Sequence, residues 1–228
     1  MKNLNQYIQE KFILNKNTKP KYQYFLKTKG ELRSILEERL AKDKNANLND
    51  INVSEITDMS ELFKDLDPHN IDISEWDVNK VTNMTDMFYK CQNFNSDLSQ
   101  WNVSTVKNMD SMFYRCINFN SDLSKWDVSN VENMRWIFNE CNNFNSDLSN
   151  WDVSNVTNME YMFQHCTNFN SDLSKWDVSK VMNMYCMFYD CTNFNSDLSK
   201  WDVSNVTDMK HMFDKCSNLK NMPSWYKE

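Results

Sequence analysis

Apolar residues recur along this chain with a period of 25. One stretch reads Leu98-x-x-Trp101-x-Val103-x-x-Val106-x-x-Met109-x-x-Met112-Phe113-x-x-Cys116-x-x-Phe119, and the next stretch repeats the same apolar positions. We call each stretch a coil, and the coils begin at Leu48, Ile73, Leu98, Leu123, Leu148, Leu173 and Leu198, the first copy being imperfect. Self-similarity at a fixed period of 20–50 residues is the signature of repeat architectures. The pattern therefore predicts about seven stacked units.

Each coil carries its own secondary-structure signals. Trp101 and Val103 alternate with a polar residue, which predicts a short strand. Met109, Met112, Phe113 and Cys116 follow the i, i+3, i+4, i+7 spacing, which predicts a short helix. A Thr-Asn pair precedes this apolar stripe in two coils, at 82–83 and 157–158, and is suited to capping a first helical turn. The segment Asn-Phe-Asn-Ser-Asp between coils is rich in turn residues.

One strand and one helix in each 25 residues indicate an α/β repeat of the leucine-rich-repeat type. A single coil has too few apolar residues to fold alone, whereas stacked coils bury both sides of each apolar layer. We therefore expect a leucine-rich-repeat-like solenoid over residues 48–222. The stripe Leu32, Ile35, Leu36 and Leu40 predicts a helix over 31–44 that caps the first coil. Residues 1–47 are then an N-terminal arm and capping helix, and 223–228 a C-terminal tail that covers the last coil.

Composition and charge remove several classes of function. With Gly30 as its only glycine, the chain has no phosphate-binding glycine loop. Three histidines leave little room for histidine-based catalysis or a zinc site. Residues 1–47 hold eleven Lys and Arg against five Asp and Glu, a net +6, which leaves −13 for the rest of a chain whose total is −7. An acidic repeat region is poorly suited to nucleic acid, because binding there depends on neutralising phosphates.

The chain shows no targeting or membrane-spanning pattern. No run of ~18 apolar residues is present, so we expect no membrane span. The polar N-terminus has no secretory signal pattern, and the first cysteine is Cys91, too late for an early lipid anchor. On these grounds we expect a cytoplasmic protein.

Two sets of side chains invite a chemical interpretation. Six of the seven cysteines recur every 25 residues, which favours buried free thiols, with disulfides or a metal as alternatives. Cys186 falls outside this set, in a column that we expect to be exposed, and is the candidate reactive thiol. Aspartates form two ladders, compensated either by turn amides or by bound calcium. The aspartate ladders run through 72, 97, 122, 147, 172 and 197, and through 77, 127, 152, 177 and 202 with Asn102 interrupting.

Differences among the copies point to a binding face. Core and turn positions barely vary, whereas positions in the predicted helices do. Tyr, Trp and Arg are enriched at interface hot spots. The candidate protein-binding residues are Tyr114, Arg135, Trp136, Tyr161, Tyr185 and Tyr189. Drift of unconstrained surface positions after duplication would give the same variation. Every copy of the repeat is equivalent, so we expect no catalytic, cofactor-binding or metal-binding residues.

The repeated pattern Met-Phe-x-x-Cys-x-Asn-Phe followed by Trp-Asp-Val-Ser-x-Val resembles the BspA-like leucine-rich-repeat surface proteins, in their 25-residue lipoprotein-type form. The resemblance covers about 48–222, and residues 19–47 are similar to the segment that often precedes such repeats. It implies a right-handed solenoid without catalytic activity, a bacterial source and surface or secreted localisation with adhesion. The expected function is a non-enzymatic protein-binding scaffold. A calcium-binding repeat module and a purely structural surface protein remain as alternatives.

Overall fold

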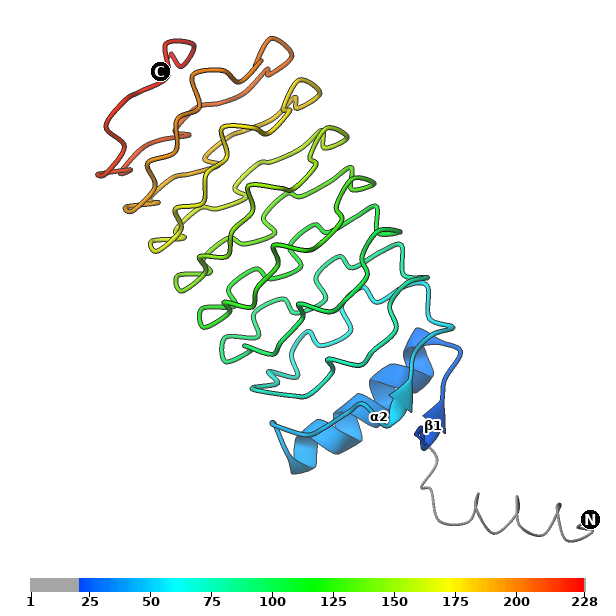
Figure 1. The fold of residues 1–228 in the computed structure, drawn as a ribbon. Helices are drawn as coiled ribbons and strands as arrows, with labels where there is room; N and C mark the ends of the chain where they lie inside the picture. Colours follow the sequence, from blue (N-terminus) through cyan, green and yellow to red (C-terminus); the bar gives the residue numbers. More distant parts are fainter. Residues whose placement is uncertain (1–20, 228) are drawn as a thin grey trace, which may run out of the picture.

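The computed structural model describes residues 21–227, and these form a stack of similar coils (Figure 1). We number the coils 1 to 7, with ranges 48–72, 73–97, 98–122, 123–147, 148–172, 173–197 and 198–222. Residues 25 apart in sequence pair as parallel bridges, as in Asn83 with Asn108 and Asn133 with Asn158. Regular secondary structure in the described part is confined to the N-terminal end: strand β1 (Tyr24–Phe25), helix α2 (Lys29–Lys42) and strand β2 (Ile51–Asn52). β1 pairs in parallel with β2.

Helix α2 lies across the first coil (Figure 1), and its sequence explains both its limits and its buried face. Thr28 accepts a hydrogen bond from the Glu31 amide while the Glu31 side chain accepts from the Thr28 amide, a capping box that fixes the start. Leu32, Leu36 and Leu40 are buried against the coils. The helix predicted over 31–44 is thus present two residues earlier, at Lys29–Lys42.

Within each coil, the segment predicted as a helix is a run of tight turns instead. Residues 110–115 of coil 3 are turns, with left-handed φ angles of 56° at Ser111 and 59° at Arg115. An α-helix requires negative φ throughout, so the helix prediction is wrong here. The predicted apolar stripe is nevertheless buried, because successive turns also direct every third or fourth side chain inward. The short strand predicted at 101–103 is wrong as well, since those residues carry no strand pairing.

The turn run creates the ladder that joins the coils. Alternate amides, those of Met84, Asp86, Phe88 and Lys90 in coil 2, donate to carbonyls of coil 3 at 2.7–2.9 Å. The same four-bond row recurs at each later junction, up to the bonds from coil 6 to coil 7. Left-handed residues at two positions per coil turn these amides along the stack. Every such row has one polarity: its amides point toward the C-terminal end and its carbonyls toward the N-terminal end.

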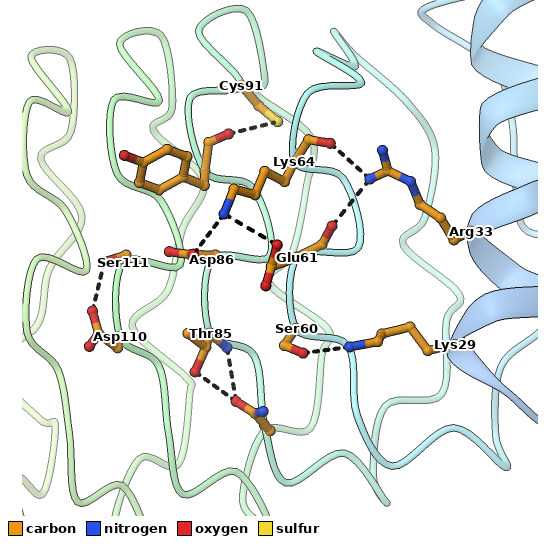
Figure 2. A network of polar contacts seen from close by, with 12 residues as sticks. Lys29, Arg33, Ser60, Glu61, Lys64, Thr85, Asp86, Cys91, Asp110 and Ser111 are labelled. Carbon is orange, nitrogen blue, oxygen red and sulfur yellow. Dashed lines mark hydrogen bonds and ion pairs between the residues drawn. The ribbon is translucent and has the colours of Figure 1, made fainter.

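At the N-terminal end, α2 binds part of the carbonyl row that has no preceding coil, namely the carbonyls of Leu62 and Lys64 (the bond to Lys64 is drawn in Figure 2). Nη1 of Arg33 donates to the carbonyls of Glu61, Leu62 and Lys64 at 3.2, 2.9 and 2.8 Å. Nζ of Lys29 donates to the Ser60 hydroxyl at 2.7 Å. The helix therefore covers the first coil with both an apolar face and a set of donors.

Side chains also form ladders through the core. Each indole of the repeated tryptophans donates to a carbonyl of the preceding coil at 3.0 Å, as Trp126 does to Leu98. Phenylalanine rings stack from coil to coil, with centroids 5.7 Å apart for Phe113 and Phe138. The tryptophan ladder continues through Trp225, one residue short of the period, which stacks on Trp201 and donates to the Leu198 carbonyl. The winding sense of the coils and the leucine-rich-repeat-like class remain predictions.

Candidate functional site

Aromatic rings of six successive coils form one continuous line, which we call the aromatic row. Its members are Tyr89, Tyr114, Trp136, Tyr161, Tyr185 and His211. Adjacent ring centroids lie 4.7, 5.2, 5.0, 5.2 and 5.9 Å apart. The first pair is stacked, and the last three contacts are edge-on. Both geometries are favourable for aromatic pairs.

The row is positioned by the backbone of the turn run. Trp136, Tyr161 and His211 occupy the first left-handed position of their coils, with φ of 58°, 56° and 58°. Bulky side chains seldom adopt this conformation, which favours glycine. Here the hydrogen-bonded ladder imposes the conformation, because the amides of Trp136 and Tyr161 donate to Glu160 and Tyr185 of the following coils. The strained position therefore brings large rings into contact across coils.

Cationic side chains lie over several of these rings. The guanidinium carbons of Arg115 and Arg135 are 5.5 Å and 5.2 Å from the ring centroids of Tyr114 and Trp136. Both arginines also form ion pairs with the following coil, Arg115 with Glu140 at 2.8 Å and Arg135 with Glu160 at 3.1 Å. Rings flanked by oriented cations combine apolar contact area with charge, the residue chemistry typical of interface hot spots.

The first five rings of the row are partly buried, because each packs on its neighbours, whereas His211 at the end of the row is exposed. Burial, followed by the neighbouring phenol of Tyr185, raises the pKa of Tyr161 to about 12. Nε1 of Trp136 is buried without a hydrogen-bond partner among the described residues. A donor in that state is energetically unfavourable.

The structure brings most of the predicted site residues together. Tyr114, Trp136, Tyr161 and Tyr185 are consecutive members of the aromatic row, and Arg135 covers Trp136. Tyr189 lies outside it, against His165 at 5.4 Å and under Nζ of Lys215 at 4.9 Å. Sequence reasoning missed the two ends, Tyr89 and His211, although both occupy the variable columns that supplied the others.

The prediction that Cys186 is an exposed, reactive thiol is wrong. Its side chain is 5% exposed, and burial raises the pKa of its thiol. Ser111, in the same column, is also buried.

The repeated cysteines have a role that apolar periodicity does not reveal. All seven thiols are free, and those of the column are buried except Cys216, which is partly buried. Each column thiol donates to a phenylalanine carbonyl of the preceding coil, as Cys141 does to Phe113 at 2.9 Å. Burial raises the pKa of these thiols well above the usual range, as for Cys141 and Cys191. The column is therefore a set of core hydrogen-bond donors.

The aspartate ladders are satisfied within their own turns. Oδ1 of Asp122 accepts from the Ser124 amide at 2.9 Å, and Asp127 accepts from Ser129 at 3.1 Å. The serine amide and hydroxyl lower the pKa of Asp122. Across residues 21–227, no three or more His, Cys, Asp or Glu side chains are grouped so as to hold a metal ion. The calcium hypothesis therefore gains no support from the ladders.

In the part of the chain that the structure describes, no helix has both the length and the apolar character needed to cross a bilayer.

Comparison with known proteins identifies the family but not the activity. Searches among curated proteins and among solved structures found no match. A family described as "Mycoplasma protein of unknown function, DUF285" matches residues 32–135 and 117–226. These two matches together span most of the sequence and all of the coils, so the chain belongs to this repeat-containing DUF285 family.

Proposed function

We propose that this protein is a non-enzymatic scaffold that binds another protein through the aromatic row. The observation that carries the proposal is the continuity of the row, in which six rings from six coils touch in sequence. Each of coils 2 to 7 contributes one ring, at a position where the copies differ. Such a surface offers contact area that grows with the number of coils.

A further observation supports a binding role. Arg115 and Arg135 are held over rings by ion pairs, so little side-chain freedom is lost when a partner docks. Resemblance to BspA-like surface proteins suggests adhesion at a cell surface as the setting, and we include that setting in the proposal.

Site-specific photo-crosslinking tests the proposal. A photoreactive phenylalanine replaces Tyr161 in one sample and the exposed Lys175, in a polar groove between coils 5 and 6, in a matched control. Both proteins are incubated with extracts and intact surfaces of the native cells. We expect a discrete crosslinked protein from position 161 alone, competed by unmodified chain and not by a Trp136→Ser/Tyr161→Ser double variant. Equal crosslinking from both positions, or from neither, would contradict the proposal.

A further inference from the structure

The C-terminal end of the stack presents a row of backbone amides that no further coil pairs with, and beside them the Tyr226 ring packs against Phe213 at a centroid distance of 5.0 Å. In coil 6, the amides of Met184, Cys186, Phe188 and Asp190 donate to coil 7 at 2.8–3.0 Å. The equivalent amides of coil 7 are those of residues 209, 211, 213 and 215. No acceptor for any of the four is found within residues 21–227. We call these four amides the open donor row.

The apolar surface beside the open donor row is also incompletely covered. Val206 and Met209 are partly exposed, whereas their counterparts in coils 2 to 6 are fully buried. Met222 is 52% exposed. Two open hollows of about 410 and 370 Å³ adjoin the row. Lys215 and Met222 line the first, Lys210 lines the second, and Asp214 and Tyr226 line both. An occupant would thus meet donors, apolar side chains, two lysines and the Asp214 carboxylate, which pairs with His211 at 2.9 Å.

Ion pairs between internal coils indicate which charges belong above those lysines. In two columns the cation comes from one coil and the acid from the coil that follows it in sequence. The pairs are Arg135 with Glu160 in the column of Lys210, and Arg115 with Glu140 and His165 with Asp190 in the column of Lys215. The opposite order, as in Asp110 below Arg135, gives no ion pair among the described residues. Lys210 and Lys215 therefore occupy the cation position of such a pair, and no following coil among the described residues supplies the acid.

A second copy of this chain cannot supply the missing row with its first coil as folded. Two of the four carbonyls in that coil's row, those of Leu62 and Lys64, are already bound by Arg33, and α2 covers the face of the coil. The occupant must instead be an extended segment whose carbonyls are free.

We propose that the open donor row binds an extended segment of a partner protein, with two carboxylates five residues apart and apolar side chains between them. The segment lies parallel to residues 208–215 and accepts four backbone hydrogen bonds, as each coil does from the one below. Its carboxylates pair with Lys210 and Lys215. Its apolar residues cover Met209 and Met222. This surface meets the aromatic row only at His211, and Trp136 and Tyr161 in coils 4 and 5 take no part in it, so either proposal can fail alone.

A synthetic peptide provides the probe. It copies residues 158–165, Asn-Met-Glu-Tyr-Met-Phe-Gln-His, with glutamate in place of the final histidine, so that its two acids are five residues apart. A control peptide carries glutamine at both acidic positions. Binding to the full chain is measured by calorimetry, and amide hydrogen exchange is followed with and without peptide.

We expect exchange at 209, 211, 213 and 215 to be fast in the free chain and slow in the complex. Charge reversal at both exposed lysines, Lys210→Glu with Lys215→Glu, should weaken binding about tenfold, as should the glutamine peptide. The matched reversal Lys175→Glu with Lys200→Glu should leave affinity unchanged. Absence of binding at millimolar peptide, unchanged exchange at the four amides, or equal effects of the two reversals would overturn the proposal. So would self-association of the chain that Lys210→Glu abolishes, since the occupant would then be a second copy.

Discussion

Arg33 is the side chain on which closure of the N-terminal end depends most. Replacement by methionine keeps most of the apolar stem and removes the guanidinium, which leaves the carbonyls of Glu61, Leu62 and Lys64 without this donor. Nη1 carries two hydrogens, so we count two full bonds, those of 2.8 and 2.9 Å. A hydrogen bond to a charged group contributes about 1.5–3 kcal/mol. Because Arg33 is 28% exposed and water can partly replace it, the lower value applies, and the expected loss is about 3 kcal/mol.

The loss should be local to the first coil. In a stack, each coil is stabilised mainly by its neighbours, so damage at one end frays that end first. Amide exchange in coil 1 should accelerate in Arg33→Met while exchange in coil 4 stays as in the parent chain, and urea unfolding followed by tryptophan fluorescence should begin earlier. Glu37→Gln is the control, since it removes only the helical ion pair of Arg33, a contribution under ~0.5 kcal/mol. A change in Arg33→Met no larger than in the control, or exchange that accelerates uniformly, would refute the reasoning.

Four further predictions concern the coils themselves. Trp151→Phe should lower the free energy of unfolding by about 2 kcal/mol, because the Trp151 indole donates a hydrogen bond to the preceding coil. Trp136→Phe should lower it by under ~1 kcal/mol, because the Trp136 indole makes no such bond among the described residues. Urea midpoints that shift equally in the two variants would contradict this. Lys90→Gly should stabilise the fold by up to ~1 kcal/mol through relief of its left-handed φ of 61°, and a lower melting temperature would count against that account. Cys141 and the other buried thiols should resist alkylation at pH 8 until urea is added, so rapid labelling of the native chain would contradict their burial. The pKa values of Asp122 and its equivalents are lowered in the folded chain, so the stabilisation from these carboxylates is fully present above about pH 5 and is lost as pH falls through the folded pKa. The urea midpoint should therefore stay level from pH 7 to 5 and drop below about pH 4. A midpoint that does not drop would be inconsistent with this account.

Much of the architecture was accessible from periodicity alone. The 25-residue spacing of residues such as Trp126 and Trp151 placed them in one column, and their stacking follows directly. The apolar stripe of α2 was equally clear, although the helix was predicted over 31–44 and begins at Lys29, after the Thr28 cap. In both cases the decisive interactions repeat or lie close in sequence.

The run of tight turns in each coil could not be predicted from the sequence, for a physical reason. Met109, Met112, Phe113 and Cys116 have the spacing of a helical stripe, and successive tight turns bury the same positions. Left-handed residues are usually marked by glycine or asparagine, but here Ser111 and its equivalents include no glycine. The conformation is imposed by hydrogen bonds to the next coil, which no local pattern records. The misplacement of Cys186 has the same origin.

The candidate site, too, could be predicted only in part from the sequence. Variable columns identified Tyr114, Trp136, Tyr161 and Tyr185, but contact among them depends on how the turns project each ring. Arg33 was invisible as a functional residue, because its acceptors are backbone carbonyls that lie 28 to 31 residues away in sequence. Long-range bonds to the main chain leave no side-chain signature in the sequence.

The central claim is that residues 25 apart are neighbours along one axis, and spin-label distances test it most directly. Spin labels at Glu75→Cys and Lys175→Cys are four coil spacings apart, and labels at Glu75→Cys and Lys200→Cys are five coil spacings apart. The native thiols are buried and should stay unlabelled, apart from the partly buried Cys216. With a parallel spacing of about 4.8 Å, the second mean distance should exceed the first by about 5 Å. Equal distances, or a longer distance for the shorter separation, would contradict the stack.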